Sequence, residues 1–471
     1  MNLNEMTIEK AHQHLIKGDF SARELTEAYL KNIKEKNEDF NIYLEVFDDV
    51  LKQADQADKL IKEGKSSLMT GIPMAIKDNI LMKGKKVSAS SKILKGYKAT
   101  YDAGVIKRLK ESGAIFLGRT NMDEFAMGSS TENSAYSRTK NPIDPNRVPG
   151  GSSGGSAVAV AMNGALCALG SETGGSIRQP ASFCGIVGLK TTYGAVSRSG
   201  LIAMASSLDQ IGPLTKTVAD AEIVFNIIRK KDILDSTSVD YQEKKYGELN
   251  KMRIGVPRDF LKGEGINKEV LDNFKKSLQK LELAGHKIID LELPLLKYSL
   301  AIYYILMPAE ASSNLARFDG LRYGSKKTGE NLFNSYLKTR RSGFGKEVRR
   351  RIMLGTYVLS HGYYDAYYNK ANKLKKIINN DLIKSFKEVD VIITPTSPFP
   401  AFKAGEKIED PMVMYYSDFF TVPANITGIP AISIPSGKTK DNLPLGVQFM
   451  APHFREDLLF KISKEFLLIY E

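Results

Sequence analysis

Cysteine is scarce in this sequence, with Cys167 and Cys184 the two examples among 471 residues. Both stand among small or apolar neighbours and neither has the spacing of a metal ligand, so we expect two buried, reduced thiols. Runs of 18 or more apolar residues are absent, which excludes a helix that spans a membrane. The N-terminus has no charged segment followed by an apolar one, so a secretory signal is not expected. These absences together predict a cytoplasmic protein.

Common nucleotide and nucleic-acid motifs are missing as well. There is no G-x-G-x-x-G and no glycine-rich loop ending in G-K-[ST], and zinc fingers and RNA-binding signatures are absent. Basic side chains nevertheless outnumber acidic ones by 67 to 54, a formal charge of +13. The densest basic segment, residues 338–351, is compatible with nucleic acid, but arginine clusters also bind carboxylates and other subunits. A lysine-rich solvated surface also explains the overall charge.

Alternating helical and strand-like segments predict an α/β fold. Residues 5–64 contain two or three amphipathic helices, one opening with a capping box at Ser21 and Glu24. We expect one large domain over 1–471, with N-terminal helices at 1–64, a catalytic core at 66–212, and a remainder at 213–471 that includes a helical insertion. Strands are expected within 71–79, 114–121, 165–175, 185–194, 252–257, 286–294, 389–398 and 431–437, and helices within 7–18, 21–37, 46–64, 103–113, 217–230, 268–285 and much of 298–386.

The stretch PGGSSGGSAVAV, residues 149–160, is rich in glycine and serine and runs into an apolar segment. It satisfies the G-x-S-x-G pattern of a nucleophile elbow around Ser152, but a proline-broken loop precedes it where that motif needs a strand. A flexible linker fits no better, because residues 156–169 are apolar on every side, so the loop before them enters a packed interior. None of the five histidines lies in this glycine-rich region, so a Ser–His–acid triad would need a distant histidine.

A second stretch, GSETGGSIRQPA at 170–181, is better placed for catalysis. The apolar residues before it predict a strand, and residues 173–176 then form a tight turn. Consecutive glycines allow several backbone N–H groups to point at one spot, as an oxyanion hole requires, with Ser176 at its edge. An ordinary glycine turn capped by serine is the alternative for this stretch taken alone.

A serine nucleophile needs a base, and Lys77 is the candidate in the absence of a local histidine. Lys77 ends the apolar run GIPMAIK, so its neighbours predict burial, whereas most lysines of this chain face solvent. Because desolvation lowers the pKa of an amine, a buried lysine can be neutral and accept a proton.

Three features, AIKDN, GGSSGGS and ETGGSIRQPA, occur in this order and together resemble the amidase signature family, whose Ser–Ser–Lys triad hydrolyses carboxamides. The resemblance implies an α/β fold with a mixed central sheet between layers of helices. It makes Ser176 the nucleophile, Ser152 the bridging serine after a cis peptide bond, and Lys77 the base. Glu172 stands where the family usually has aspartate, which puts the hydrogen bonds of this longer carboxylate in question. The oxyanion hole would be lined by Thr173, Gly174, Gly175 and the Ser176 N–H.

Further segments resemble the A subunits of tRNA-dependent amidotransferases over nearly the whole chain. That resemblance implies a glutaminase that passes ammonia to a B subunit, where Glu-tRNA(Gln) is activated with ATP and Mg²⁺ and amidated, while a small C subunit clamps the complex. It implies no cofactor in this chain. A stand-alone amidase for small carboxamides is the main alternative, and a binding subunit on an inactive scaffold is disfavoured by the intact triad. The segments are 121–136, 193–213, 310–324, 350–368 and 418–437.

Free glutamine has an α-carboxylate and an α-ammonium, so a selective site needs an arginine and a carboxylate. The resemblance points to Arg351, Asp418 and Tyr304 for this role. Arg351 ends an arginine run with an uncertain register, Asp418 also suits a helix N-cap, and Tyr303 could replace its neighbour. Structural support, in place of catalysis, is expected from Ser153, Arg178 and Asp209.

Overall fold

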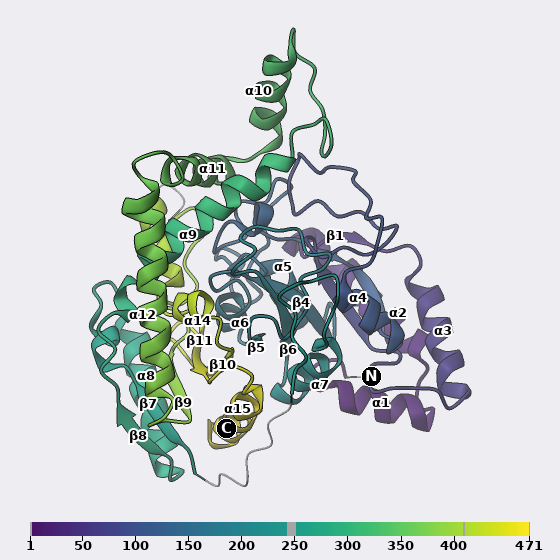
Figure 1. Ribbon diagram of the computed structural model, residues 1–471. Coiled ribbons are helices and arrows are strands. Elements are labelled where there is room, and N and C mark those ends of the chain that lie inside the picture. The colour runs from purple at the N-terminus through teal and green to yellow at the C-terminus, as the bar shows by residue number, and fades with distance from the viewer. Residues whose placement is uncertain (1, 243–250, 408–409, 471) are drawn as a thin grey trace.

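A computed structural model describes residues 2–242, 251–407 and 410–470, and an eleven-stranded mixed sheet forms its centre (Figure 1). The order is β1-β3-β2-β4-β6-β5-β10-β11-β9-β7-β8, with β2 parallel to both β3 and β4, and β7 parallel to both β8 and β9. The predicted α/β fold with a mixed sheet is therefore confirmed. The strands are β1 Tyr43–Val46, β2 Pro73–Lys77, β3 Ile115–Thr120, β4 Cys167–Glu172, β5 Val187–Lys190, β6 Gln210–Thr215, β7 Arg253–Val256, β8 Lys287–Asp290, β9 Val391–Pro395, β10 Ala431–Lys438 and β11 Pro444–Met450.

Helices surround the sheet, with α1 to α4 toward one end, α8 and α12 at the other, and α9 to α11 along the top of the view (Figure 1). Helix α2 begins with the predicted capping box between Ser21 and Glu24. None of the helices in the described part of the chain is long and apolar enough to cross a membrane. The helices are α1 Ile8–Lys17, α2 Ala22–Phe40, α3 Val50–Lys62, α4 Gly104–Glu111, α5 Gly154–Ala161, α6 Arg178–Cys184, α7 Val218–Ile228, α8 Lys268–Leu283, α9 Ser299–Asn314, α10 Leu332–Gly343, α11 Lys346–Val358, α12 Lys370–Ser385, α13 Pro411–Tyr415, α14 Val422–Thr427 and α15 Glu456–Tyr470.

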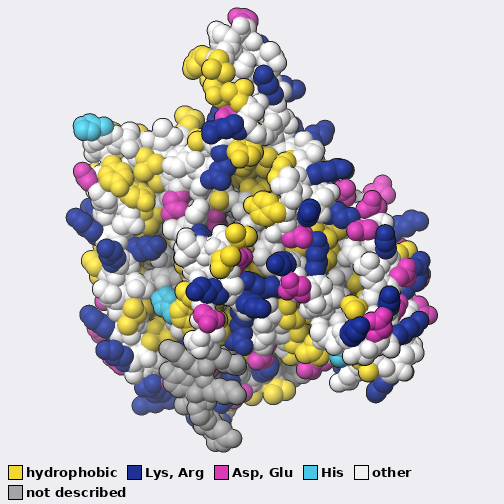
Figure 2. All heavy atoms as spheres, turned by 45° about the vertical axis from the view of Figure 1, so that its right-hand side comes forward, with side chains coloured by type: hydrophobic (Ala, Val, Ile, Leu, Met, Phe, Trp, Pro, Cys, Tyr) yellow, Lys and Arg dark blue, Asp and Glu magenta, His cyan; other side chains and the backbone are white. Residues whose placement is uncertain are grey.

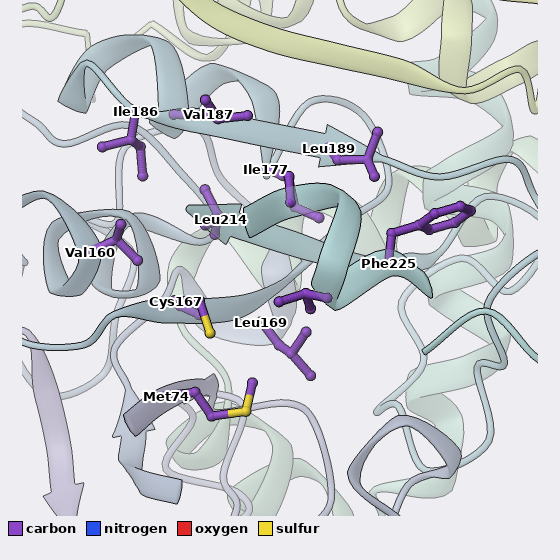
Figure 3. Close-up of a cluster of buried hydrophobic side chains, with 14 of the residues drawn as sticks. Met74, Val160, Cys167, Leu169, Ile177, Ile186, Val187, Leu189, Leu214 and Phe225 are labelled. Atoms are coloured by element: carbon purple, nitrogen blue, oxygen red, sulfur yellow. The ribbon is translucent and has the colours of Figure 1, made fainter. Parts of the chain in front are cut away.

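The core lies where the central strands meet the helices α5, α6 and α7. Every residue of β2 and β4 is buried, which explains the apolar sequences with which both strands begin. Both cysteines are buried free thiols, as predicted. Figure 3 shows how side chains from these strands and helices meet, among them Met74, Val160, Cys167, Leu169, Ile177, Leu189, Leu214 and Phe225.

Three expectations differ from the structure. The helix expected over 46–64 begins at Val50, because Tyr43–Val46 pair with β3. Strands β1, β6 and β11 were not predicted. The helical region 298–386 is interrupted by an irregular segment before α10, and this segment and α10 project from the molecule (Figure 1).

Candidate active site

The site lies where the neighbouring parallel strands β2 and β4 end. Their register pairs Ile76 with Leu169, so the carboxyl ends of both strands reach the same edge of the sheet. Lys77 is the last residue of β2, and the glycine turn at 173–176 follows β4 directly. Strand pairing therefore holds the predicted base and the predicted nucleophile on adjacent segments.

Lys77 is fully buried and makes three short contacts. Its Nζ lies 2.7 Å from Ser152 Oγ, 2.7 Å from Ser153 Oγ and 3.0 Å from the Ser171 carbonyl oxygen. Burial lowers the pKa of Lys77 to about 7, although Asp123, Glu172 and Asp209 oppose this shift. A substantial fraction of the amine is therefore neutral near pH 7.

The hydrogen bonds distinguish the two adjacent serines. A neutral amine has two N–H donors and one lone pair. The Ser171 carbonyl can only accept, and the Ser153 hydroxyl donates its own hydrogen to that carbonyl at 3.1 Å. The two amine hydrogens therefore go to Ser171 and Ser153. Of these groups, the Ser152 hydroxyl is the one left with a hydrogen for the Lys77 lone pair.

The loop before α5 holds Ser152 and contacts the glycine turn. The peptide bond between Gly151 and Ser152 is cis. The Ser153 N–H donates to the Ser176 carbonyl at 3.1 Å, and the Gly151 N–H donates to Gln179 Oε1 at 2.9 Å. Among the described residues, no hydrogen bond joins the hydroxyls of Ser152 and Ser176, as is common in enzymes without bound substrate.

The turn itself offers unused donors. In the described part of the chain the N–H groups of Gly174, Gly175 and Ser176 have no protein acceptor. Tyr303 packs so closely here that a Cβ on Gly174 would lie 2.6 Å from its Cζ atom, so glycine is needed at this position. Three adjacent N–H groups without acceptors can bind an oxyanion.

Hydrogen bonds between buried polar groups support the glycine turn. The Thr173 hydroxyl donates to Asp209 Oδ1 at 2.6 Å. Glu172 accepts from the backbone N–H groups of Ile177 and Arg178 at 2.9 and 3.0 Å, from Arg178 Nε at 2.8 Å and from Asn425 Nδ2 at 3.1 Å. Burial alone would raise the pKa of Glu172, but Arg178 outweighs it and holds that pKa below its ordinary value. The longer carboxylate therefore has a full set of hydrogen bonds.

Opposite charges lie beside the turn. The Tyr304 hydroxyl donates to Asp418 Oδ2 at 2.9 Å, and Asp418 Oδ1 would lie 3.4 Å from a Cβ placed on Gly175. The Arg351 guanidinium lies 5.4 Å from the Tyr304 ring centre and borders a cavity of about 260 Å³. Burial raises the pKa of Asp418 to about 7, and Tyr304 and Arg351 partly oppose this. Asp418 ends a short 3₁₀ helix, Tyr416–Asp418, and caps no helix N-terminus there.

Sequence reasoning did not identify three residues of this pocket. The Ser129 hydroxyl donates to Asp418 Oδ1 at 3.1 Å. Glu347 accepts from Arg351 Nε at 2.8 Å and from the Tyr415 hydroxyl at 2.9 Å. The one available signal was the position of Glu347, four residues before Arg351 on the same helix.

Comparison with known proteins shows the family of the chain. Residues 24–460 match the amidase family model. The chain is 51% identical over 99% of its length to the A subunit of the glutamyl-tRNA(Gln) amidotransferase of Thermoanaerobacter pseudethanolicus, with 96% of that protein covered. The corresponding protein of Halothermothrix orenii is 52% identical, with 98% of this chain and 97% of that protein covered.

Solved structures agree with these relatives. The crystal structure of the A subunit of the same amidotransferase from Thermotoga maritima superposes with a TM-score of 0.82 at 43% identity, covering 98% of this chain and 94% of that one. A peptide amidase from Stenotrophomonas maltophilia superposes with a TM-score of 0.80 at 26% identity, covering 99% and 97%. The chain therefore belongs to the amidase family, among the A subunits of glutamyl-tRNA(Gln) amidotransferases.

Proposed function

We propose that this chain hydrolyses glutamine and supplies the released ammonia for the conversion of Glu-tRNA(Gln) to Gln-tRNA(Gln). The observation that carries the chemical part is the arrangement around Lys77, a buried amine whose Nζ lies 2.7 Å from the Ser152 hydroxyl oxygen and whose pKa is lowered to about 7 by burial. Such an amine can act as a base near neutral pH without a histidine.

In the first half-reaction, Ser176 Oγ attacks the side-chain amide carbon of glutamine. The Ser176 proton passes to Ser152 Oγ as the Ser152 proton passes to Lys77 Nζ. The carbonyl oxygen becomes an oxyanion and accepts hydrogen bonds from the N–H groups of the turn. Thr173, Gly174 and Gly175 line this oxyanion hole. The relay then runs backwards and protonates the amide nitrogen, the C–N bond breaks, and ammonia leaves an ester on Ser176.

In the second half-reaction, water attacks the ester carbon and gives its proton to the same relay. The C–O bond to Ser176 breaks, the serine takes the proton back, and glutamate leaves. The cycle consumes one glutamine and one water and yields one glutamate and one ammonia.

Glutamine is selected by charge. Arg351 binds its α-carboxylate and Asp418 its α-ammonium, while the Tyr304 hydroxyl orients Asp418. Asp418 must be ionised for this role, and the incoming ammonium favours that form because an opposite charge lowers a carboxyl pKa.

The ammonia is used by another protein of the complex. The chain works with a B subunit, which activates Glu-tRNA(Gln) with ATP and Mg²⁺, and with a small C subunit, and itself uses no cofactor. We place this complex in the cytoplasm. The segments 1–64, 66–212 and 213–471 act as one domain, since all three contribute strands to the same sheet.

The adjacent serines provide a matched test of the relay, since each lies 2.7 Å from Lys77 Nζ. Ser152→Ala breaks the proton path and should lower the kcat for glutamine by about 10³-fold or more, as expected for residues of one catalytic unit. Ser153→Ala removes a hydrogen bond but leaves the path intact, so its loss should be about tenfold. Equal losses in the two variants would contradict the relay.

A second experiment tests the supply of ammonia in the assembled complex. Ser176→Ala should abolish amidation of Glu-tRNA(Gln) driven by glutamine and preserve amidation driven by added ammonium. Loss of both would contradict the proposed role. Rapid hydrolysis of aryl amides by the isolated chain, without reaction of glutamine in the complex, would instead indicate a stand-alone amidase.

A further inference from the structure

Residues 319–343, which we call the arm, project from the body of the molecule (Figure 1). The arm consists of an irregular segment, 319–331, followed by helix α10. Of the twelve residues of α10, Thr339 and Gly343 are buried. The arm is joined to the body near Ile93, where the Ile93 N–H donates to the Gly343 carbonyl and the Ser325 N–H donates to the Ile93 carbonyl.

The exposed surface of α10 is apolar on one side. Leu332, Phe333 and Leu337 are 60%, 69% and 52% exposed. Figure 2 shows hydrophobic side chains gathered on one side of the projection, with Lys and Arg side chains beside them and at its base. A twelve-residue helix is marginally stable in water without packing. Clustered exposed apolar side chains mark a surface that another molecule covers.

A groove of about 420 Å³ lies at the root of the arm. The arm forms one wall, and residues near Tyr97 and Tyr101 form the other. Tyr97, Tyr101 and Tyr323 are 36%, 49% and 56% exposed there, although large aromatic side chains are usually covered. The residues that line the groove include Tyr97, Tyr101, Arg317, Phe318, Arg322 and Tyr323. Tyrosine and arginine are the residue types enriched where protein partners bind most tightly.

The charge of this surface is positive. The arm has six Lys or Arg residues and two acidic ones, Asp319 and Glu330. Arg317 and Arg322 line the groove, and the Arg322 side chain is 73% exposed although its Nε lies 3.5 Å from Asp319. A partner that complements this surface carries acidic side chains.

The apolar component favours a protein over an RNA. Nucleic acid would use the basic side chains and stack bases on aromatic rings, but it would leave the leucines of α10 in water. We propose that the arm and its root groove bind an acidic segment of another subunit of the amidotransferase, whose apolar side chains cover α10. This inference rests on the proposed function, which requires such a subunit.

The test measures the dissociation constant between this full chain and the other purified subunits. One variant combines Leu332→Ser with Phe333→Ser, and a second combines Arg317→Glu with Arg322→Glu. Each should raise the dissociation constant at least about tenfold, the size expected for central interface residues. The matched control, Lys52→Glu with Lys62→Glu on α3, lies away from the arm and should change it less than twofold (Figure 1). Circular dichroism and thermal midpoints establish that each variant is folded.

A photo-crosslinking amino acid in place of Phe333 identifies the occupant. We expect links to an acidic segment of another subunit, whereas links to tRNA or to a second copy of this chain would overturn the proposal. Wild-type affinity in both arm variants would overturn it too. In that case glutamine-driven amidation by the wild-type complex still supports the proposed function. If the wild-type chain drives no amidation and binds none of the other subunits, both proposals fail.

Discussion

Glutamine hydrolysis should depend on pH through Lys77, because the relay needs a neutral amine. Burial lowers the pKa of Lys77 from 10.5 to about 7. A base with this pKa is about 90% neutral at pH 8 and about 10% neutral at pH 6. The turnover number kcat should therefore be nearly constant above about pH 8 and approach a tenfold fall per pH unit at acidic pH.

The ratio kcat/KM should fall more steeply, because burial also raises the pKa of Asp418 to about 7. In the free enzyme Asp418 must be ionised to hold the glutamine ammonium, and Lys77 must be neutral at the same time. Both conditions fail as the pH falls. The product of the two fractions is about 1% at pH 6, so the limiting slope is about 100-fold per pH unit.

The assay measures ammonia release by the complex from about pH 5.5 to about pH 9, with kcat and KM determined separately. Lys190 is the matched control, since burial also lowers its pKa to about 7, while its amine donates to the carbonyls of Thr191 and Ile429. Lys190→Met should therefore retain the acid limb. A kcat that stays constant to about pH 5.5, or an acid limb that disappears in Lys190→Met, would refute Lys77 as the base.

Glu347→Gln should raise the KM for glutamine about tenfold with little change in kcat, because Arg351 loses the negative charge that orients its guanidinium. Steady-state kinetics measures both constants, and a fall in kcat in place of the rise in KM would contradict this prediction. Glu172→Gln should lower the free energy of unfolding by about 3–5 kcal/mol, because Arg178 keeps a buried charge without its partner, and urea denaturation would expose an error if the loss were below about 1 kcal/mol. Lys77→Met should be inactive yet more stable. Lysine binds its proton more weakly in the folded chain than in the unfolded one, so its burial penalty is full below pH 7 and disappears above the unfolded pKa. The thermal midpoint should therefore rise more at pH 7 than at pH 9, and an equal or lower midpoint would contradict the argument.

The strand-turn units that carry the proposed triad follow from local sequence, whereas the roles of the triad residues come from the family resemblance. An apolar run ending in Lys77 becomes a buried strand, and consecutive glycines become a turn with free N–H groups, because these outcomes depend on neighbours in the chain. Strand β6 does not follow in this way. It contains Pro213, which cannot donate to a sheet ladder, yet it pairs with β4 on one side and β5 on the other. Burial between two strands distant in sequence overrides the local preference.

The proposed glutamine pocket was harder to predict because its tyrosine and its arginine each stand beside residues of the same type. Successive residues of a helix point about 100° apart, so neighbours face different surroundings. Tyr303 packs against Gly174 of the turn, whereas Tyr304 reaches Asp418. In the arginine run at the start of α11, Arg351 is buried between Glu347 and the tyrosine rings. The packing of the helices determines which residue of each pair or run faces the site, and local sequence does not predict that packing.

At the glycine turn, the proposed catalytic residues meet the proposed glutamine contacts, and this has a consequence for how such enzymes diversify. The proposed bond-breaking residues all lie between Lys77 and Ser176, while the proposed glutamine contacts lie between Tyr304 and Asp418, and the groups meet at Gly174 and Gly175. The proposed glutamine contacts in the second segment can therefore be varied while the first segment stays constant. A library confined to these contacts would search for new amide substrates while the proposed catalytic residues stay unchanged. The same separation allows substrate preference to change during evolution while the hydrolytic mechanism is kept.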